Sequence, residues 1–160
     1  MTDPPWLDER EARAWRGYRR MRALLDLQLT RDLANDAGLS DADYDVLSTL
    51  SEAETHRLRL HELAARILWS NSRLSHHISR MEQRGLVLRA GEAANARACV
   101  IGLTAAGLRT IQEAAPGHVV SVRRHFIDLL TAEQLDMLGD ATESVVEHLS
   151  TVAGGVVDQR

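Results

Sequence analysis

Apolar side chains recur every three or four residues along much of the chain, which is the spacing of amphipathic helices. The first such stripe predicts a long helix over residues 7–36, and Gly38 supplies a place for it to end. Ser40 and Asp43 then have the spacing of a capping box, in which each side chain binds the backbone N–H of the other residue. A second helix is therefore expected to begin at Ser40 and to run to about Leu50.

The middle of the chain combines two short helical stripes with two strand-like runs. Residues 60–67 predict a third helix, and Ser70 is a good N-cap for a fourth helix that Gly85 ends. Two helices joined by so short a turn are typical of a helix-turn-helix. The runs 86–89 and 98–101 flank a stretch of small residues, so they predict a β-hairpin.

The last third of the chain again predicts helices. Thr104 can cap a long helix that Pro116 and Gly117 are expected to kink or interrupt, and Thr131 can start a final helix. The terminal stripes carry more apolar surface than one small domain can cover, so pairing between chains is the natural way to bury it. This order of elements predicts a mainly α fold with a small β-hairpin wing: a winged helix-turn-helix with N- and C-terminal dimerisation helices.

The distribution of charge along the chain says more about a binding partner than the net charge does. The chain as a whole carries a net charge of −4, which by itself does not suit a partner made of phosphates. From His56 to Arg97, however, eight arginines stand against three acidic residues, a net charge of +5, so the remainder carries −9. A local basic surface is expected where only one part of a protein meets nucleic acid, although a solvated helical face would show the same clustering.

Cys99 is the single cysteine, which excludes an internal disulfide and a cysteine-based zinc site. It falls in a predicted strand without an evident activating partner, so we expect an inert thiol. The start of the chain is acidic and contains Pro4 and Pro5, unlike a secretory signal. No apolar run approaches the roughly 20 residues that span a bilayer, and we expect a cytoplasmic protein.

Four segments of the chain form a recognisable set of motifs: the run Ser72–Val87, the later run Leu103–Gly107, and the segments 38–47 and 114–119. Together they resemble the MarR family of multiple-antibiotic-resistance-type transcription regulators. The likeness covers nearly all of the chain from Trp15 to about Leu138.

This resemblance implies that residues 1–160 form one protein of this type, two copies of which pair as a homodimer that binds double-stranded DNA. The dimerisation helices would be residues 7–36 and 104–155, which interlock between the two copies, and the winged helix-turn-helix lobe would be residues 40–103. In such a lobe the fourth helix enters the major groove and the wing approaches the minor groove.

A recognition helix needs short polar and cationic side chains at its N-terminal end, because those positions point into the groove. Arg73 is the first choice for a base contact, since a guanidinium can bind both O6 and N7 of guanine. Arg97 on the wing would reach the minor groove, although Asn95 stands where many relatives carry an aspartate that could orient this arginine. The alternative is that these are exposed helix charges or a hairpin salt bridge. The candidate DNA-binding residues are Ser70, Ser72, Arg73, Ser75, His76, His77, Arg80 and Arg97.

Regulators of this kind often bind a small aromatic or anionic effector in a crevice beside the DNA-binding lobe. Trp15, Tyr18 and Tyr44 could line such a crevice with aromatic faces, and Arg22 could pair with a carboxylate. A tryptophan and a tyrosine at helical spacing also fit a core or a dimer interface.

No motif points to an enzyme. His61 and Glu62 are not followed by a second histidine at metalloprotease spacing, and the chain has neither a Gly-rich phosphate loop nor a nucleophile elbow. His118 and His125 lie two helical turns apart, but without a denser cluster they are expected at a surface or interface. We expect no metal and no cofactor.

The sequence therefore predicts a DNA-binding transcription regulator, a repressor in the commoner outcome for the family, that a small effector can release. A two-fold symmetric dimer would bind a pseudo-palindromic operator with half-sites about 10 bp apart. The alternative is a helical ligand- or protein-binding dimer that has lost DNA binding, which the net charge and the altered wing tip allow.

Overall fold

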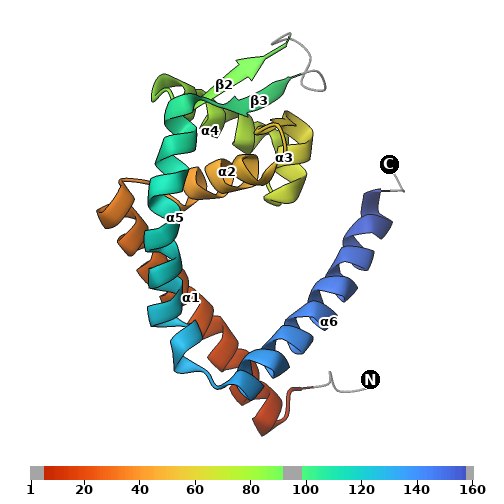
Figure 1. Cartoon of the computed structure of the whole chain (residues 1–160). Coiled ribbons are helices and arrows are strands. Elements are labelled where there is room, and N and C mark those ends of the chain that lie inside the picture. The colour runs from red at the N-terminus through yellow and green to blue at the C-terminus, as the bar shows by residue number, and fades with distance from the viewer. Residues whose placement is uncertain (1–5, 92–98, 158–160) are drawn as a thin grey trace. The chain divides into compact units, whose positions relative to one another are not determined.

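The computed structural model describes residues 6–91 and 99–157, with side chains up to residue 152. The chain divides into two compact units, Met1–Ser121 and Val122–Arg160. The described residues are mostly helical and include one small three-stranded sheet, which confirms the predicted fold class (Figure 1).

Helix α1, Glu9–Ala37, opens the first unit. Asp8 caps its first turn, because its side chain accepts a hydrogen bond from the N–H of Glu11 while the Glu11 carboxylate accepts one from the N–H of Asp8. The helix ends at Gly38, whose φ of 64° is a left-handed conformation that glycine adopts at little cost.

Three further helices build the body of this unit: α2 is Asp41–Glu52, α3 is Leu60–Arg66 and α4 is Asn71–Gln83. Helix α2 begins with the predicted capping box between Ser40 and Asp43, with both hydrogen bonds at 3.1 Å. Helices α3 and α4 pack against each other and form the predicted helix-turn-helix.

The sheet has the order β1-β3-β2, with antiparallel pairing throughout. Its hairpin strands, β2 (Val87–Ala90) and β3 (Val100–Leu103), lie one or two residues later than the sequence predicts. Strand β1, Arg57–Arg59, is absent from the sequence prediction because it is too short to show an alternating pattern. It pairs with β3 across more than 40 residues of chain, with Leu58 opposite Ile101.

The core of the first unit lies between the helices and the sheet. Leu74, Ile78 and Met81 turn the apolar side of α4 inward at the predicted spacing. Cys99 is buried here as a free thiol, 4% exposed. The largest fully buried side chains are Val46, Leu47, Leu50, Leu63, Leu74, Ile78, Met81 and Ile101.

Helix α5, Ala105–His125, starts at Thr104, whose hydroxyl accepts a hydrogen bond from the N–H of Gly107 at 2.9 Å, as a predicted cap should. The helix continues through Pro116, so the interruption expected there does not occur. Proline has no N–H to donate to the preceding turn, but the remaining hydrogen bonds and the packing of the helix hold it together.

Besides the last residues of α5, the second unit contains the short 3-10 helix η1, Ile127–Leu129, and the long helix α6, Ala132–Val157. Helix α6 begins as predicted at Thr131, which forms a capping box with Gln134. Its apolar side chains are largely exposed within one chain: Met137, Val145, Val146, Leu149 and Val152 are each more than half exposed.

Among the described residues, no helix is both long enough and apolar enough to cross a membrane.

Candidate nucleic-acid interface

Helix α4 presents one polar side to solvent from its first turn onward. Ser70 caps the helix, since its hydroxyl accepts a hydrogen bond from the N–H of Arg73 at 3.2 Å. Ser72, Arg73 and His76 follow as exposed residues, opposite the buried apolar stripe. The free N–H groups of the first turn and these side chains are suited to phosphates and base edges.

Arg73 does not extend freely into solvent. Its guanidinium carbon lies 3.9 Å from the centre of the Trp69 ring, on the face of the indole. Such a cation–π contact contributes about 0.5–1 kcal/mol at an exposed site. Trp69 therefore restricts the positions that Arg73 can take and presents the guanidinium at the start of the helix.

His77 is the one predicted DNA-binding residue on α4 that the structure turns inward, with 6% of its surface exposed. Its Nε2 lies 3.1 Å from Oδ1 of Asp43 on α2, although the N–H is not aligned well enough for a hydrogen bond. A guanidinium nitrogen of Arg80 lies 2.7 Å from Nδ1, and the rings of Trp69 and His77 form a T-shaped pair with an interplanar angle of 82°. His77 is therefore not available for a direct contact with DNA.

Asp43 connects α4 to the start of α2. Besides closing the capping box with Ser40, its carboxylate accepts a hydrogen bond of 2.7 Å from Arg84. Burial raises the pKa of Asp43, but the hydrogen bonds from Arg84 and Ser40 outweigh this effect, so the pKa lies below the ordinary 3.8. The Asp43 side chain is an anion at neutral pH and pairs with the guanidinium of Arg84.

Arg89 on β2 joins the wing to the recognition helix. Its guanidinium donates to Glu82 at 2.9 Å and to the carbonyl oxygen of Ser75 at 2.6 Å, and its backbone N–H donates to Glu82 at 3.0 Å. The Ser75 hydroxyl lies 3.3 Å from the same guanidinium, so it faces the wing strand. Sequence reasoning missed Arg89 and Trp69, since no local pattern distinguishes them from other polar or core residues. It found Asp43 only as part of the capping box and not as the partner of Arg84.

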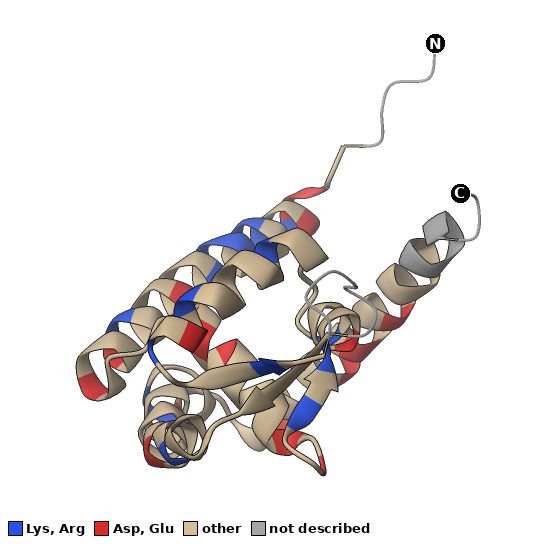
Figure 2. Cartoon of the chain, turned by 90° about the horizontal axis from the view of Figure 1, so that it is seen from above, with Lys and Arg blue, Asp and Glu red and all other residues tan. Residues whose placement is uncertain are grey.

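The charged residues are unevenly distributed over the fold. Figure 2 shows basic positions along α1 and on the wing strands, whereas α6 carries acidic residues and no arginine among its described residues. Arg97, the predicted minor-groove contact, lies outside the described residues, as does Asn95.

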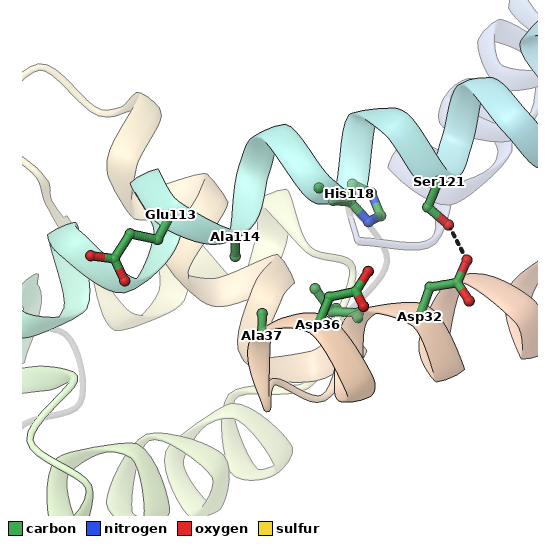
Figure 3. A pocket seen from close by; sticks show the side chains of 9 residues that line it. Asp32, Asp36, Ala37, Glu113, Ala114, His118 and Ser121 are labelled. Atoms are coloured by element: carbon green, nitrogen blue, oxygen red, sulfur yellow. Dashed lines mark hydrogen bonds between the residues drawn. The ribbon is translucent and has the colours of Figure 1, made fainter.

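A cavity of about 290 Å³ lies between α1 and α5 (Figure 3). Asp32, Asp36 and Glu113 contribute carboxylates to its wall, and Ser121 donates a hydrogen bond to Asp32. His118 also lines this cavity and packs its ring against Tyr44, with the ring centres 4.3 Å apart. The wall is negatively charged, so it does not suit the anionic effector that the sequence suggests.

The four residues predicted to bind an effector do not come together in one chain. Trp15 and Tyr18 stack at 5.9 Å, and Arg22 lies over the Tyr18 ring at the same distance. Tyr44 instead contacts His118, near the end of α1 that contains Asp36. At 1.5 Å of rise per residue, Tyr18 and Asp36 are about 27 Å apart along α1.

Together, the three-stranded sheet, the capped helix α4 and the wing strand tied to it define a winged helix-turn-helix protein. A family model described as "MarR family" matches residues 39–98. The chain is 43% identical to AbsC, a MarR family transcriptional regulator from Streptomyces coelicolor, over 92% of this chain and 99% of that one, with a TM-score of 0.86. The chain belongs to the MarR family.

Two other solved structures extend this comparison. Sco3205, a MarR family transcriptional regulator from Streptomyces coelicolor solved in complex with DNA, is 38% identical over 91% of this chain and 92% of its own, with a TM-score of 0.85. The organohalide-sensing regulator RdhR-CbdbA1625, solved with 2,4-dichlorophenol, shares the fold at 20% identity, over 92% of this chain and 88% of its own, with a TM-score of 0.75. No curated protein sequence matches the chain significantly.

Proposed function

We propose that this protein is a sequence-specific DNA-binding regulator that acts as a homodimer in the cytoplasm and represses the genes next to its operator. The observation that carries the proposal is the start of α4, where Arg73 rests on Trp69 beside the exposed Ser72 and His76. A relative 38% identical over nearly the whole chain has been solved with DNA, which supports the same use of this helix.

The dimer is proposed because α1 and α6 leave apolar side chains uncovered in one chain. On α1, Leu24 and Leu27 are each about half exposed, as are several residues of α6. A second copy would cover both stripes, and its two-fold axis would place two α4 helices at successive major grooves.

Release by a small aromatic effector completes the proposal. Its support is the stacked pair Trp15 and Tyr18 with Arg22 beside it, and the 2,4-dichlorophenol found in a protein of the same fold. Benzoate is expected to quench tryptophan fluorescence and to weaken DNA binding, whereas benzylamine, with the same ring and the opposite charge, is the control. Equal responses to both, or none, would exclude an anionic aromatic effector of this kind.

The decisive experiment measures DNA binding by fluorescence anisotropy. The probes are the duplex flanking the protein's own gene and duplexes enriched from a random library, at several salt concentrations and against a scrambled duplex. Saturable binding to an inverted repeat that weakens as salt rises is expected. Failure on the whole library would instead favour a dimer that binds a ligand or a protein and not DNA.

The variant Arg73→Ala tests whether Arg73 contacts a base or only the phosphate backbone. If Arg73 reads a guanine, its loss weakens binding to the preferred duplex by about 1–3 kcal/mol, while binding to a duplex altered at that base pair changes little. Arg109→Ala, which removes an exposed arginine from α5, is the matched control. An equal loss on both duplexes would show that Arg73 contacts phosphate alone.

A further inference from the structure

One buried histidine lies among the arginines of α4. His77 is on the same side of the helix as Leu74 and Ile78, and is nearly as buried as they are. Among the described residues, the charged groups at its ring are Asp43 from α2 and Arg80 and Arg84 from α4. The surroundings of His77 thus include two cations of the recognition helix.

The contact with Arg80 determines which ring nitrogen carries the proton. A guanidinium has donors only, so Arg80 donates at 2.7 Å and Nδ1 of His77 must accept. The proton of the neutral ring is then on Nε2, which faces the Asp43 carboxylate. Burial lowers the pKa of His77, and Arg80 and Arg84 lower it further against the opposing effect of Asp43, so the ring is neutral at pH 7.

His77 also reaches Arg73 through one intermediate ring. Trp69 meets the His77 ring edge-on, with the ring centres 5.5 Å apart, and Arg73 lies over the face of the same indole. A change in the volume of residue 77 would therefore move the surface on which Arg73 rests. His77 therefore contacts both exposed arginines of the helix: it binds Arg80 directly, and it contacts Arg73 through the Trp69 ring.

We propose that His77 is a positioning residue for DNA recognition. Its neutral ring accepts a hydrogen bond from Arg80 and supports Trp69, and so holds Arg80 and Arg73 in the orientation in which they meet DNA. This inference rests on the proposed DNA-binding function and assigns His77 no contact with DNA itself.

A double-mutant cycle on a duplex enriched from a random library tests this role. His77→Phe keeps a ring against Trp69 but removes the acceptor, so DNA binding should weaken about 3- to 10-fold through the lost order of Arg80. In an Arg80→Ala background the same substitution should change binding by less than about twofold, because the arginine that it orders is absent. Equal losses in both backgrounds would overturn the proposal.

His77→Asn provides the rescue, since its Oδ1 lies near the position of Nδ1 and can accept from Arg80. Because asparagine lacks the ring that packs against Trp69, the comparison is made through the coupling with Arg80→Ala: H77N should keep more of this coupling than H77F. A coupling lost equally in both variants would count against the proposal. Thermal unfolding of every variant separates a loss of fold from a loss of orientation.

The unaltered protein supplies a measurement that does not depend on any of these variants. Long-range ¹H–¹⁵N NMR spectra are expected to show the Nε2–H tautomer of His77 at pH 7, and the Nδ1–H tautomer would overturn the proposal. If the unaltered protein binds no duplex of the library, the proposed function fails, whereas the NMR result still shows whether Nδ1 of His77 is free to accept a hydrogen bond from Arg80.

Discussion

Asp43 shows how much one buried carboxylate can organise. It caps α2, accepts from Arg84 and faces Nε2 of His77, so its oxygens have polar partners although the residue is only 4% exposed. A buried charge without partners would be strongly destabilising, and here the partners come from two separate helices. The position of α4 against α2 thus depends on this side chain.

Asp43→Asn should lower the free energy of unfolding by about 2 kcal/mol at pH 7. This cost is smaller than that of breaking a fully buried ion pair, because Arg84 is partly exposed to solvent. Because the folded-state pKa of Asp43 lies below 3.8, the unfolded chain binds more protons near that pH. The stability that the carboxylate contributes is therefore present above 3.8 and is lost as the pH falls through the folded-state pKa.

Urea unfolding at several pH values checks this prediction. The difference between the unaltered protein and D43N should shrink as the pH falls from 3.8 through the folded-state pKa of Asp43, below which both side chains are neutral. Asp41→Asn is the matched control, since Asp41 is exposed in the same first turn of α2, and it should cost only a few tenths of a kcal/mol. A D43N cost that stays constant down to pH 2.5 would contradict the charge argument.

At the scale of elements, the junction between the wing and α5 requires a glycine. A Cβ on Gly107 would lie 1.9 Å from the carbonyl oxygen of Leu86, far inside any real contact. Thr104 fastens the same junction, because its hydroxyl donates to the carbonyl oxygen of Gly85 at 2.6 Å. The first turn of α5 can thus approach the start of β2 only without a side chain at residue 107.

Gly107→Ala should destabilise the fold by at least about 2 kcal/mol, because backbone atoms have to move apart. Gly117→Ala is the matched control on the same helix: nothing lies within 4 Å of its added Cβ, and alanine favours a helix by about 0.5–1 kcal/mol. Thermal unfolding should show opposite shifts in Tm for the two variants. Equal shifts would mean that the close approach at residue 107 does not exist in solution.

At the scale of the whole molecule, the apolar side chains of α6 are largely uncovered in a single chain. Val145 and Leu149 lie one helical turn apart and are each 58% exposed. Exposed apolar stripes of this length are typical of obligate subunit interfaces. A second copy of the chain would cover this stripe, which supports the proposed dimer.

Val145→Glu combined with Leu149→Glu should convert a dimer into monomers, because two carboxylates would have to be buried without partners. Analytical ultracentrifugation measures the mass, and affinity for a full inverted repeat should fall by about 100-fold while that for a half-site changes little. Glu147→Ala, on the same helix, is the control. An unaltered protein that sediments as a monomer would refute the proposed dimer.

Local chemistry explains what could be predicted from the sequence. The capping pairs Ser40 with Asp43 and Thr131 with Gln134, and the caps Ser70 and Thr104, all connect residues three apart, so the chain alone determines them. The apolar spacing of α4 is equally local. Helix α4 and the exposed Arg73 at its start follow from these features. The sequence predicts that His77 faces DNA, but it lies beside Leu74 and Ile78 on the buried side of the helix.

Features that depend on contacts between residues distant in the sequence were decided only by the tertiary structure. Strand β1 exists because β3 supplies its hydrogen bonds, and the burial of His77 is tolerated because Asp43 lies 34 positions earlier in the sequence yet 3.1 Å away in the fold. The closeness of Gly107 to Leu86 has the same origin. A local pattern shows which face of a helix is apolar, but only the packed chain supplies the groups that make a buried polar residue stable.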